Sequence, residues 1–305
     1  MKNKFKKNYK FILGTIFGVI ISASSAFAVS VLTGDKIPYD NTNSKLSSTN
    51  VKDAIDEVNT RATKKVEEAK ASCPDGYICS KPSFKDESWE TIAANVKAGK
   101  ASAYQVGDTK EIYMGSLGTH TVRIANTSSC TYEYASETTC GFVVEFADII
   151  SYQQMNSTQT NVGGWPASAM RTYVNETVYN LLPSDLQNVI ATTTVVSGHG
   201  STSGETNFTS SDKLYLLSQV EVWNYTPFDT SKSKTRQLDY YKNKGVTKSN
   251  CSGAIKQYNG SAYWWWLRSA DSSDARSFFK VSSSGNWGDD NATKTYGVSP
   301  AFRIA

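Results

Sequence analysis

The sequence has little of what enzymes most often use for catalysis. Its 305 residues include only 2 His and 5 Cys, and no two cysteines form a C-x-x-C pair. No glycine-rich segment carries a Walker lysine or a dinucleotide-binding pattern. His120 and His199 have no obvious partners, and the NCSG segment around Cys251 matches no thiol-enzyme motif. We therefore expect a protein that is not an enzyme, with a secreted enzyme as the weakest alternative.

The chain also lacks a surplus of positive charge outside its N-terminus. The formal net charge is +4, and the five lysines within residues 1–28, which contain no acid, exceed it by one. The remainder gives no support to a phosphate-binding surface, so we expect no nucleic-acid partner. Hydrophobic residues make up 39% and charged residues 20%, which excludes a polar disordered chain and a multi-span membrane protein. Aromatics, at 12%, favour a domain rich in strands.

The N-terminus has the three parts of an export signal in their usual order. The lysines precede the apolar run FILGTIFGVII at residues 11–21, and Ala26-Phe27-Ala28 is a small-residue cleavage site. We expect residues 1–28 to be a cleaved signal peptide. The alternative is an uncleaved N-terminal membrane anchor, because residues 11–32 are just long enough to span a bilayer. Either way residues 29–305 would be extracellular, free or at the cell surface.

The cysteines are placed as in an exported, disulfide-containing chain. Cys73 and Cys79 bracket CPDGYIC, whose Pro, Asp and Gly favour a turn. Cys130 and Cys140 bracket a second short segment, CTYEYASETTC. Two local disulfides are the simplest pairing and leave Cys251 over. Free thiols are the alternative, whereas a zinc site is disfavoured because ligands at metal-binding spacing are missing.

Residues 29–83 are predicted to form a linker followed by a helix. Asn50 is a candidate N-cap. An apolar stripe at spacings of three and four then continues to about Lys70, through Val51, Ala54, Ile55, Val58, Ala62, Val66 and Ala69. A self-associating stalk, a short coiled coil, would bury this stripe and make the protein a homo-oligomer through residues 50–70. The alternative is a helix that lies on its own domain.

Residues 84–305 are predicted to form one domain of the α+β class, because helices come early and most strands late. Expected helices are one capped by Ser88, one from Pro166 to Pro183, one opened by the capping-box pair Ser218 and Glu221, and Thr235–Lys244. Expected strands are Glu111–Met114, Thr121–Ala125, Phe142–Phe146, Lys213–Leu217, Ala262–Ser269, Ser277–Ser282 and Gly297–Ile304.

Five segments resemble, in order, those of one bacterial family, the domain of unknown function numbered 6273. They are SWETIAANVKAGKASAYQVGDTKEI, GGWPASAMRTYVN with LLPSDLQ after it, DKLYLLSQVEVW, YWWWLRSA and GVSPAFRI, over about residues 84–305. The resemblance implies a C-type-lectin-like fold with a mixed or antiparallel sheet, also similar to formylglycine-generating enzymes, whose cysteine motifs are absent here. It places the strands of Arg268 and Arg303 in the core sheet. The family usually has a basic residue at the position of Ser299, so no role carries over to that serine.

The candidate ligand-binding residues lie in the segments between the last predicted strands. Trp287 lies in the polar segment SSSGNWGDDN, next to Asp289, Asp290 and Asn291. Asp271 and Asp274 lie in the preceding loop. Aromatic faces stack on sugar rings and anchor protein contacts. The alternative is that Trp287 covers the sheet as a lid, and Trp264, Trp265 and Trp266 are expected in a strand packed on both faces.

The same acidic residues are hard oxygen ligands of the kind that calcium prefers. The sequence has neither an EF-hand pattern nor the EPN or WND triplet of calcium-binding lectins. We therefore expect no cofactor and no metal site, with calcium as the alternative left open. Solvated loop acids are the simpler interpretation.

Together these features predict an exported bacterial protein with a helical stalk and a C-type-lectin-like head. The head is expected to bind a glycan or a protein through its C-terminal loops without catalysis. The alternative is a structural or scaffolding head in a surface assembly.

Overall fold

The computed structural model describes residues 34, 37–42, 44, 46–71, 82–129, 136–201 and 206–305. The chain divides into two compact units, Met1–Cys79 and Ser80–Ala305, and each is described by itself. The predicted signal peptide lies outside the described residues. Among the residues described, no helix is both long and apolar enough to cross a membrane.

The first unit contains helix α2 (Val51–Ala71), as the apolar spacing predicts. Asn50 caps it, because its side-chain Oδ1 accepts a hydrogen bond of 2.9 Å from the Asp53 N–H. Ile55 and Val58 of the predicted stripe are 53% and 50% exposed. The helix is therefore confirmed, and these two residues of its stripe are exposed, whereas Ala54 is buried.

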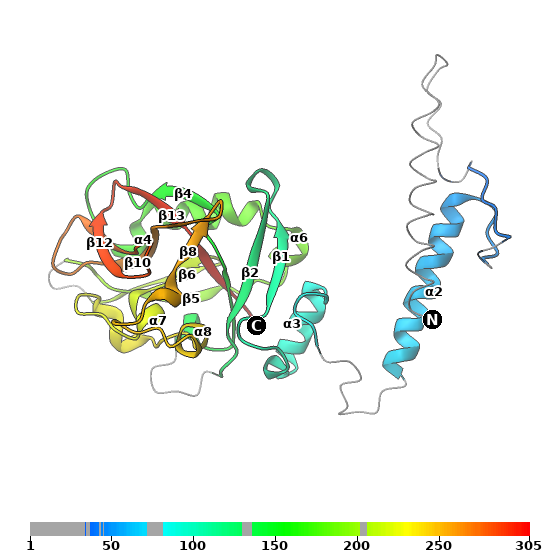
Figure 1. Cartoon of the computed structure of the whole chain (residues 1–305), viewed down its shortest axis with the longest axis horizontal. Helices are drawn as coiled ribbons and strands as arrows, with labels where there is room; N and C mark the ends of the chain where they lie inside the picture. The colour runs from blue at the N-terminus through cyan, green and yellow to red at the C-terminus, as the bar shows by residue number, and fades with distance from the viewer. Residues whose placement is uncertain are drawn as a thin grey trace, which may run out of the picture. The chain divides into compact units, whose positions relative to one another are not determined.

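The second unit, the head, contains two five-stranded sheets (Figure 1). The first sheet has the order β1-β2-β3-β14-β7, and its neighbouring strands are antiparallel. Its strands are β1 (Thr109–Tyr113), β2 (Thr119–Asn126), β3 (Phe142–Phe146), β7 (Tyr215–Leu216) and β14 (Pro300–Ile304). β3 has the predicted bounds and is buried throughout, Glu145 included.

The second sheet has the order β12-β11-β10-β13-β4 and one parallel pair, β10 with β13. Its strands are β4 (Ser151–Gln154), β10 (Trp265–Ala270), β11 (Ser277–Val281), β12 (Trp287–Asn291) and β13 (Thr295–Val298). Two hairpins complete the head, β5 (Thr193–Ser197) with β6 (Phe208–Asp212) and β8 (Lys256–Tyr258) with β9 (Ser261–Tyr263). The α+β class is confirmed.

The helices of the head are short. They are α3 (Trp89–Lys97), α4 (Gly164–Ala167), α5 (Ala169–Thr172), the π-helical turn η5 (Tyr173–Val178), α6 (Ser184–Gln187), α7 (Gln219–Trp223) and α8 (Asp239–Asn243). Ser88 caps α3, and Ser218 with Glu221 forms the predicted capping box of α7. The helix predicted from Pro166 is instead broken at Ser168, which has an extended backbone and caps α5. Thr235 is extended as well, so α8 covers only part of the predicted helix.

Two predicted strands are each two strands. The stretch Ala262–Ser269 contains the last two residues of β9 and most of β10, and Trp264 lies between the two strands. The stretch Gly297–Ile304 leaves the second sheet with β13 and enters the first sheet with β14. Ser299 is the single residue at this crossing and is fully buried. A hydrophobic pattern indicates that a segment is extended, but it does not show where the chain passes from one sheet to another. Each pair of strands was therefore predicted as a single strand.

Candidate functional site

The structure places the predicted ligand residues on a strand rather than in a loop. Residues 287–291 form β12, which pairs with β11 in antiparallel register from Val281–Trp287 to Ser277–Asn291. The prediction of a C-terminal loop was wrong here. β12 is an edge strand whose residues are exposed or half-buried, and polar residues on an edge hide the alternating pattern of a strand.

Trp287 packs at the start of β12 and is half-buried. Its ring centroid lies 6.3 Å from that of Phe279 and 6.1 Å from that of Tyr225. The turn before it is held by Gly285, whose φ is +84° and where a Cβ would lie 2.0 Å from the Cys251 carbonyl oxygen. These contacts favour the lid interpretation of Trp287.

Asp271 and Asp274, in the loop before β11, bond to other residues of the same loop. Asp271 is 3% exposed, and its Oδ1 accepts a hydrogen bond of 2.7 Å from the Ser273 N–H. Asp274 pairs with Arg276 at 3.0 Å, and hydrogen bonds from Arg276 lower the pKa of Asp274 to about 2. No group of three or more His, Cys, Asp or Glu that could hold a metal ion occurs in the part of the chain that is described.

The structure brings Asp290 together with two aromatic residues, Tyr296 and Trp264, of which Trp264 was expected in a strand packed on both faces. Trp264 is half-buried and stacks on Tyr296, with centroids 5.7 Å apart and planes at 19°. The Lys280 ammonium lies 4.3 Å from the Trp264 ring centroid and 3.2 Å from Asp290 Oδ2. The Tyr296 hydroxyl donates a 2.7 Å hydrogen bond to the same carboxylate. Two rings, a cation and an anion therefore hold one another in place.

Three tyrosines, one from β4 and two from the β8–β9 hairpin, lie in a row beside Trp264. Tyr263, directly before Trp264, is 40% exposed and lies 4.9 Å from Tyr152 between ring centroids. Tyr152 in turn lies 4.4 Å from Tyr258. We name the five rings together the aromatic surface: Tyr152, Tyr258, Tyr263, Trp264 and Tyr296. All are exposed or half-buried.

The electrostatics of the aromatic surface keep Asp290 ionised. Burial opposes this, yet hydrogen bonds from Tyr296 and from the Asn291 N–H, together with Lys280, lower the pKa of Asp290. Burial and the hydrogen bond to Asp290 raise the pKa of Tyr296. Asp289, the next residue along β12, is exposed. The surface thus offers aromatic faces beside fixed negative charge and hydroxyl groups.

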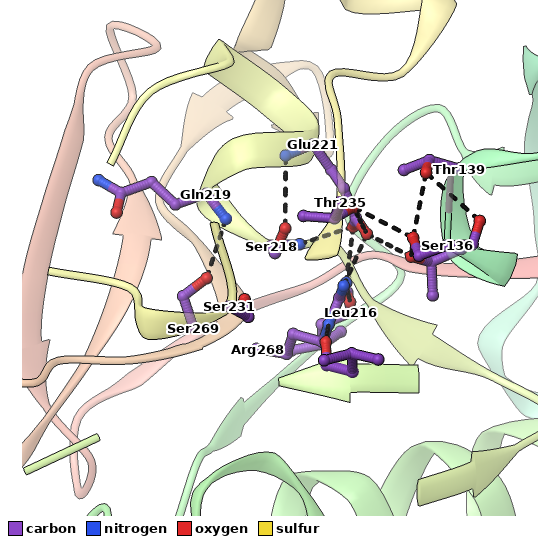
Figure 2. A network of polar contacts seen from close by, with 12 residues as sticks. Ser136, Thr139, Leu216, Ser218, Gln219, Glu221, Ser231, Thr235, Arg268 and Ser269 are labelled. Atoms are coloured by element: carbon purple, nitrogen blue, oxygen red, sulfur yellow. Dashed lines mark hydrogen bonds and ion pairs between the residues drawn. The ribbon is translucent and has the colours of Figure 1, made fainter. Parts of the chain in front are cut away.

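A buried network of polar contacts fixes β10, the strand that follows Trp264 (Figure 2). Arg268 is fully buried, and its Nη1 and Nη2 each donate a 2.6 Å hydrogen bond to one oxygen of the Glu221 carboxylate. Glu221 also accepts hydrogen bonds from the Thr138 and Thr235 hydroxyls, at 2.5 and 3.1 Å. Burial alone would lower the pKa of Arg268, but Glu221 raises it. Arg268 is therefore a core residue whose guanidinium is hydrogen-bonded.

Comparison with known families decides the relationship. Residues 143–305 match the domain of unknown function (DUF6273), a match that spans more than half of the chain. The chain belongs to this family. No curated protein and no solved structure matched the chain. The DUF6273 match contains the second sheet, β8–β9 and the whole aromatic surface, whereas the resemblance in the sequence was placed from about residue 84.

A second buried cluster joins the two sheets of the DUF6273 region. Lys256 is fully buried, and its ammonium donates hydrogen bonds to Glu145 Oε2 (2.7 Å), the Phe146 carbonyl (2.6 Å) and Ser299 Oγ (2.7 Å). Phe146 ends β3 and Ser299 separates β13 from β14, so both mark points where the chain changes sheets. Lys256 therefore places a buried basic group next to Ser299.

The cysteines and His120 are the remaining residues singled out in the sequence, and three of the cysteines lie outside the described residues. Cys73, Cys79 and Cys130 lie outside the described residues, so both disulfide pairings stay predictions. Cys140 is buried, and Cys251 is a free thiol whose Sγ lies 2.9 Å from Asn286 Oδ1. His120 lies in β2 with its Nε2 2.9 Å from the Leu117 carbonyl oxygen, as expected of a structural residue.

Sequence reasoning missed Tyr263, Trp264, Tyr296 and Lys280. Trp264 and Trp266 share one face of the strand pattern, so their spacing does not distinguish a half-exposed ring from a buried one. The available signal was the position of Tyr263 and Trp264 directly before the most apolar stretch of the segment, where a hairpin meets a buried strand.

Proposed function

We propose that this protein is an exported, non-catalytic glycan-binding protein whose binding site is the aromatic surface. The observation that carries the proposal is the group of exposed and half-buried rings around Tyr263, Trp264 and Tyr296, held by the Lys280–Asp290 pair. Large rings that are ordered before a ligand arrives lose little entropy on binding.

The chemistry of the aromatic surface suits a sugar ring. The apolar face of a pyranose stacks on an aromatic side chain, and its hydroxyl groups bond to nearby carboxylates. Asp290 supplies a carboxylate beside Trp264 and Tyr296, and the Tyr263 ring has 40% of its surface exposed. This location replaces the predicted loop site, and of the residues in that prediction Asp290 contacts it.

The non-catalytic part of the proposal is supported by the state of two acids among the candidate residues, Asp290 at the aromatic surface and Asp274 in the loop before β11. A general acid needs a pKa near the working pH, whereas the pKa values of Asp274 and Asp290 are lowered by their partners. Both carboxylates are engaged in ion pairs. Such groups position neighbouring side chains rather than exchange protons.

Export rests on the lysine-rich, apolar and Ala-x-Ala segments of residues 1–28. We also propose that the head is a divergent C-type-lectin-like domain. Support for this finer assignment is the early helices, the late strands and the C-terminal strand in the middle of a sheet.

A glycan array tests the proposal. We expect the purified protein to give specific, saturable signals, and Tyr263→Ala to weaken binding about tenfold, because an anchor ring contributes more than its neighbours. Tyr113→Ala is the matched control, since Tyr113 is 66% exposed on β1 of the other sheet. Absence of any saturable glycan signal would contradict glycan binding, and equal effects of the two variants would contradict the site.

A further inference from the structure

A pocket lined in part by Arg123, which bonds to Glu145, has the chemistry of an anion site. It has a volume of about 430 Å³ and is lined by Val106, Gly107, Thr109, Arg123, Ala147, Tyr240, Asn243 and Lys244. Two of these residues are cations and none is acidic. All belong to the head.

Arg123 brings an unused hydrogen-bonding edge to this pocket. It is 8% exposed, and its Nε donates a 2.9 Å hydrogen bond to Glu145 Oε1. Its Nη2 is buried and has no hydrogen-bond partner among the described residues. A buried donor without an acceptor is costly, so this edge is suited to an acceptor from outside the chain.

The charges around Arg123 do not balance. Glu145 accepts hydrogen bonds from Arg123 and Lys256, both buried, so one carboxylate faces two cations. Tyr241 contributes a neutral hydroxyl, which donates a 2.8 Å hydrogen bond to Glu145. An additional anion would neutralise the excess positive charge.

The nearby acids are already occupied. Asp108 accepts a hydrogen bond from the Gln105 N–H at 3.1 Å, and Asp148 accepts one from the Gln257 N–H at 2.9 Å. Asp239 pairs with Arg236 at 2.9 Å. None of the three lines the pocket.

The wall of the pocket orders the guanidinium. The Arg123 guanidinium carbon lies 3.8 Å from the centroid of the Tyr240 ring, and the Lys244 ammonium lies 5.8 Å from the same centroid. Thr109 stands opposite Arg123 in the β1–β2 register and offers a hydroxyl group. Lys244 and Asn243 are exposed, so they can move to admit a ligand.

We propose that this pocket binds a carboxylate group through the Nη1 and Nη2 atoms of Arg123, with Lys244 at its entrance. The planar edge of a guanidinium matches the two oxygens of a carboxylate in a bidentate pair. The carboxylate can belong to a small free acid or to an acidic sugar. The site is separate from the aromatic surface and does not depend on the proposed function.

Titration calorimetry of the purified protein in low-chloride buffer tests the proposal. The probes are sodium acetate, sodium glucuronate, glucose as the neutral counterpart of glucuronate, and inorganic phosphate. Binding of both carboxylates assigns a general carboxylate site, and binding of glucuronate alone assigns an acidic sugar. The proposal is overturned if neither carboxylate binds, if glucose binds as well as glucuronate, or if phosphate alone binds.

Three variants locate the binding. Lys244→Glu should weaken carboxylate binding about tenfold by placing a negative charge at the entrance. Lys242→Glu is the control, because Lys242 is an exposed lysine of the same helix that does not line the pocket. Arg123→Lys keeps the charge beside Glu145 and removes the bidentate edge, so it should also abolish binding. Equal affinity of the Lys244→Glu and Lys242→Glu variants would overturn the proposal even if Arg123→Lys fails to fold.

Discussion

Glu145 is the residue on which the buried charges of the head depend. It accepts hydrogen bonds from Arg123, Lys256 and Tyr241, and burial opposes its ionisation while the two cations lower its pKa. A carboxylate that pairs with two buried cations should matter more than either cation alone.

Glu145→Gln is therefore expected to lower the free energy of unfolding by about 3–5 kcal/mol, because two buried cations lose their partner. Lys256→Met should cost less, since Glu145 keeps Arg123 and the Phe146 carbonyl keeps a 3.1 Å hydrogen bond from Ser299. Urea unfolding of both variants measures the difference. A Lys256→Met variant that is less stable than Glu145→Gln would show that the charge balance is misassigned.

Lys256 also makes the stability depend on pH. Burial lowers the pKa of Lys256 from 10.5 to about 8, and Glu145 offsets only part of this effect. Between these values the unfolded chain binds more protons at this group, so its contribution to the free energy of unfolding rises with pH. Below pH 8 the lysine is charged in both states, and its contribution is constant.

We expect the stability of the protein relative to Lys256→Met to increase by about 1–2 kcal/mol between roughly pH 7.5 and 9.5. Comparison with the variant removes the contribution of tyrosines, which titrate in both proteins. Urea unfolding at the two pH values measures this difference. A constant difference would mean that the pKa of Lys256 is not lowered.

Trp287 is expected to act through packing. It contacts Phe279 and Tyr225 and is half-buried, so Trp287→Ala should cost about 2–3 kcal/mol, less than a fully buried tryptophan. Affinity for an array-positive glycan should stay within about twofold of that of the unchanged protein. Thermal unfolding and a glycan titration measure the two effects. Loss of affinity at unchanged stability would contradict the packing role and show that Trp287 contacts the ligand.

At the scale of elements, capping signals and apolar runs were the reliable predictors. Ser88 and the Ser218–Glu221 pair begin helices where local hydrogen bonding requires it, and β3 has the predicted bounds. β12 was missed because an edge strand tolerates polar residues on both faces. The aromatic surface was missed because it joins residues from four strands and the residue between β9 and β10, which only tertiary contacts bring together.

Helix α2 carries the prediction about self-association. Ile55 and Val58 are exposed on it, and a second copy of the helix would bury them. The mature protein should therefore be a dimer or trimer, and replacing both residues with Asp should give monomers with a folded head. Light scattering measures the mass, and circular dichroism checks the fold. A mature protein that is monomeric at high micromolar concentration would contradict the stalk.

At the scale of the whole molecule, the head is one domain because the chain passes back and forth between its two sheets. β3 leads from the first sheet to β4 of the second, and β13 leads back to β14. Lys256 bonds to both crossing points, so the buried cluster and the sheet connections stabilise each other. This arrangement gives the aromatic surface a rigid support, which a binding site needs.

The central claim, that the aromatic surface binds a glycan, is tested most directly by hydroxyl-radical footprinting with an array-positive glycan at saturation. We expect the ligand to protect the segment with Tyr263 and Trp264 and the segment with Tyr296 from labelling, while Tyr113, on β1 of the first sheet, reacts as before. Unchanged labelling of Tyr263, Trp264 and Tyr296 in the saturated complex would contradict the account.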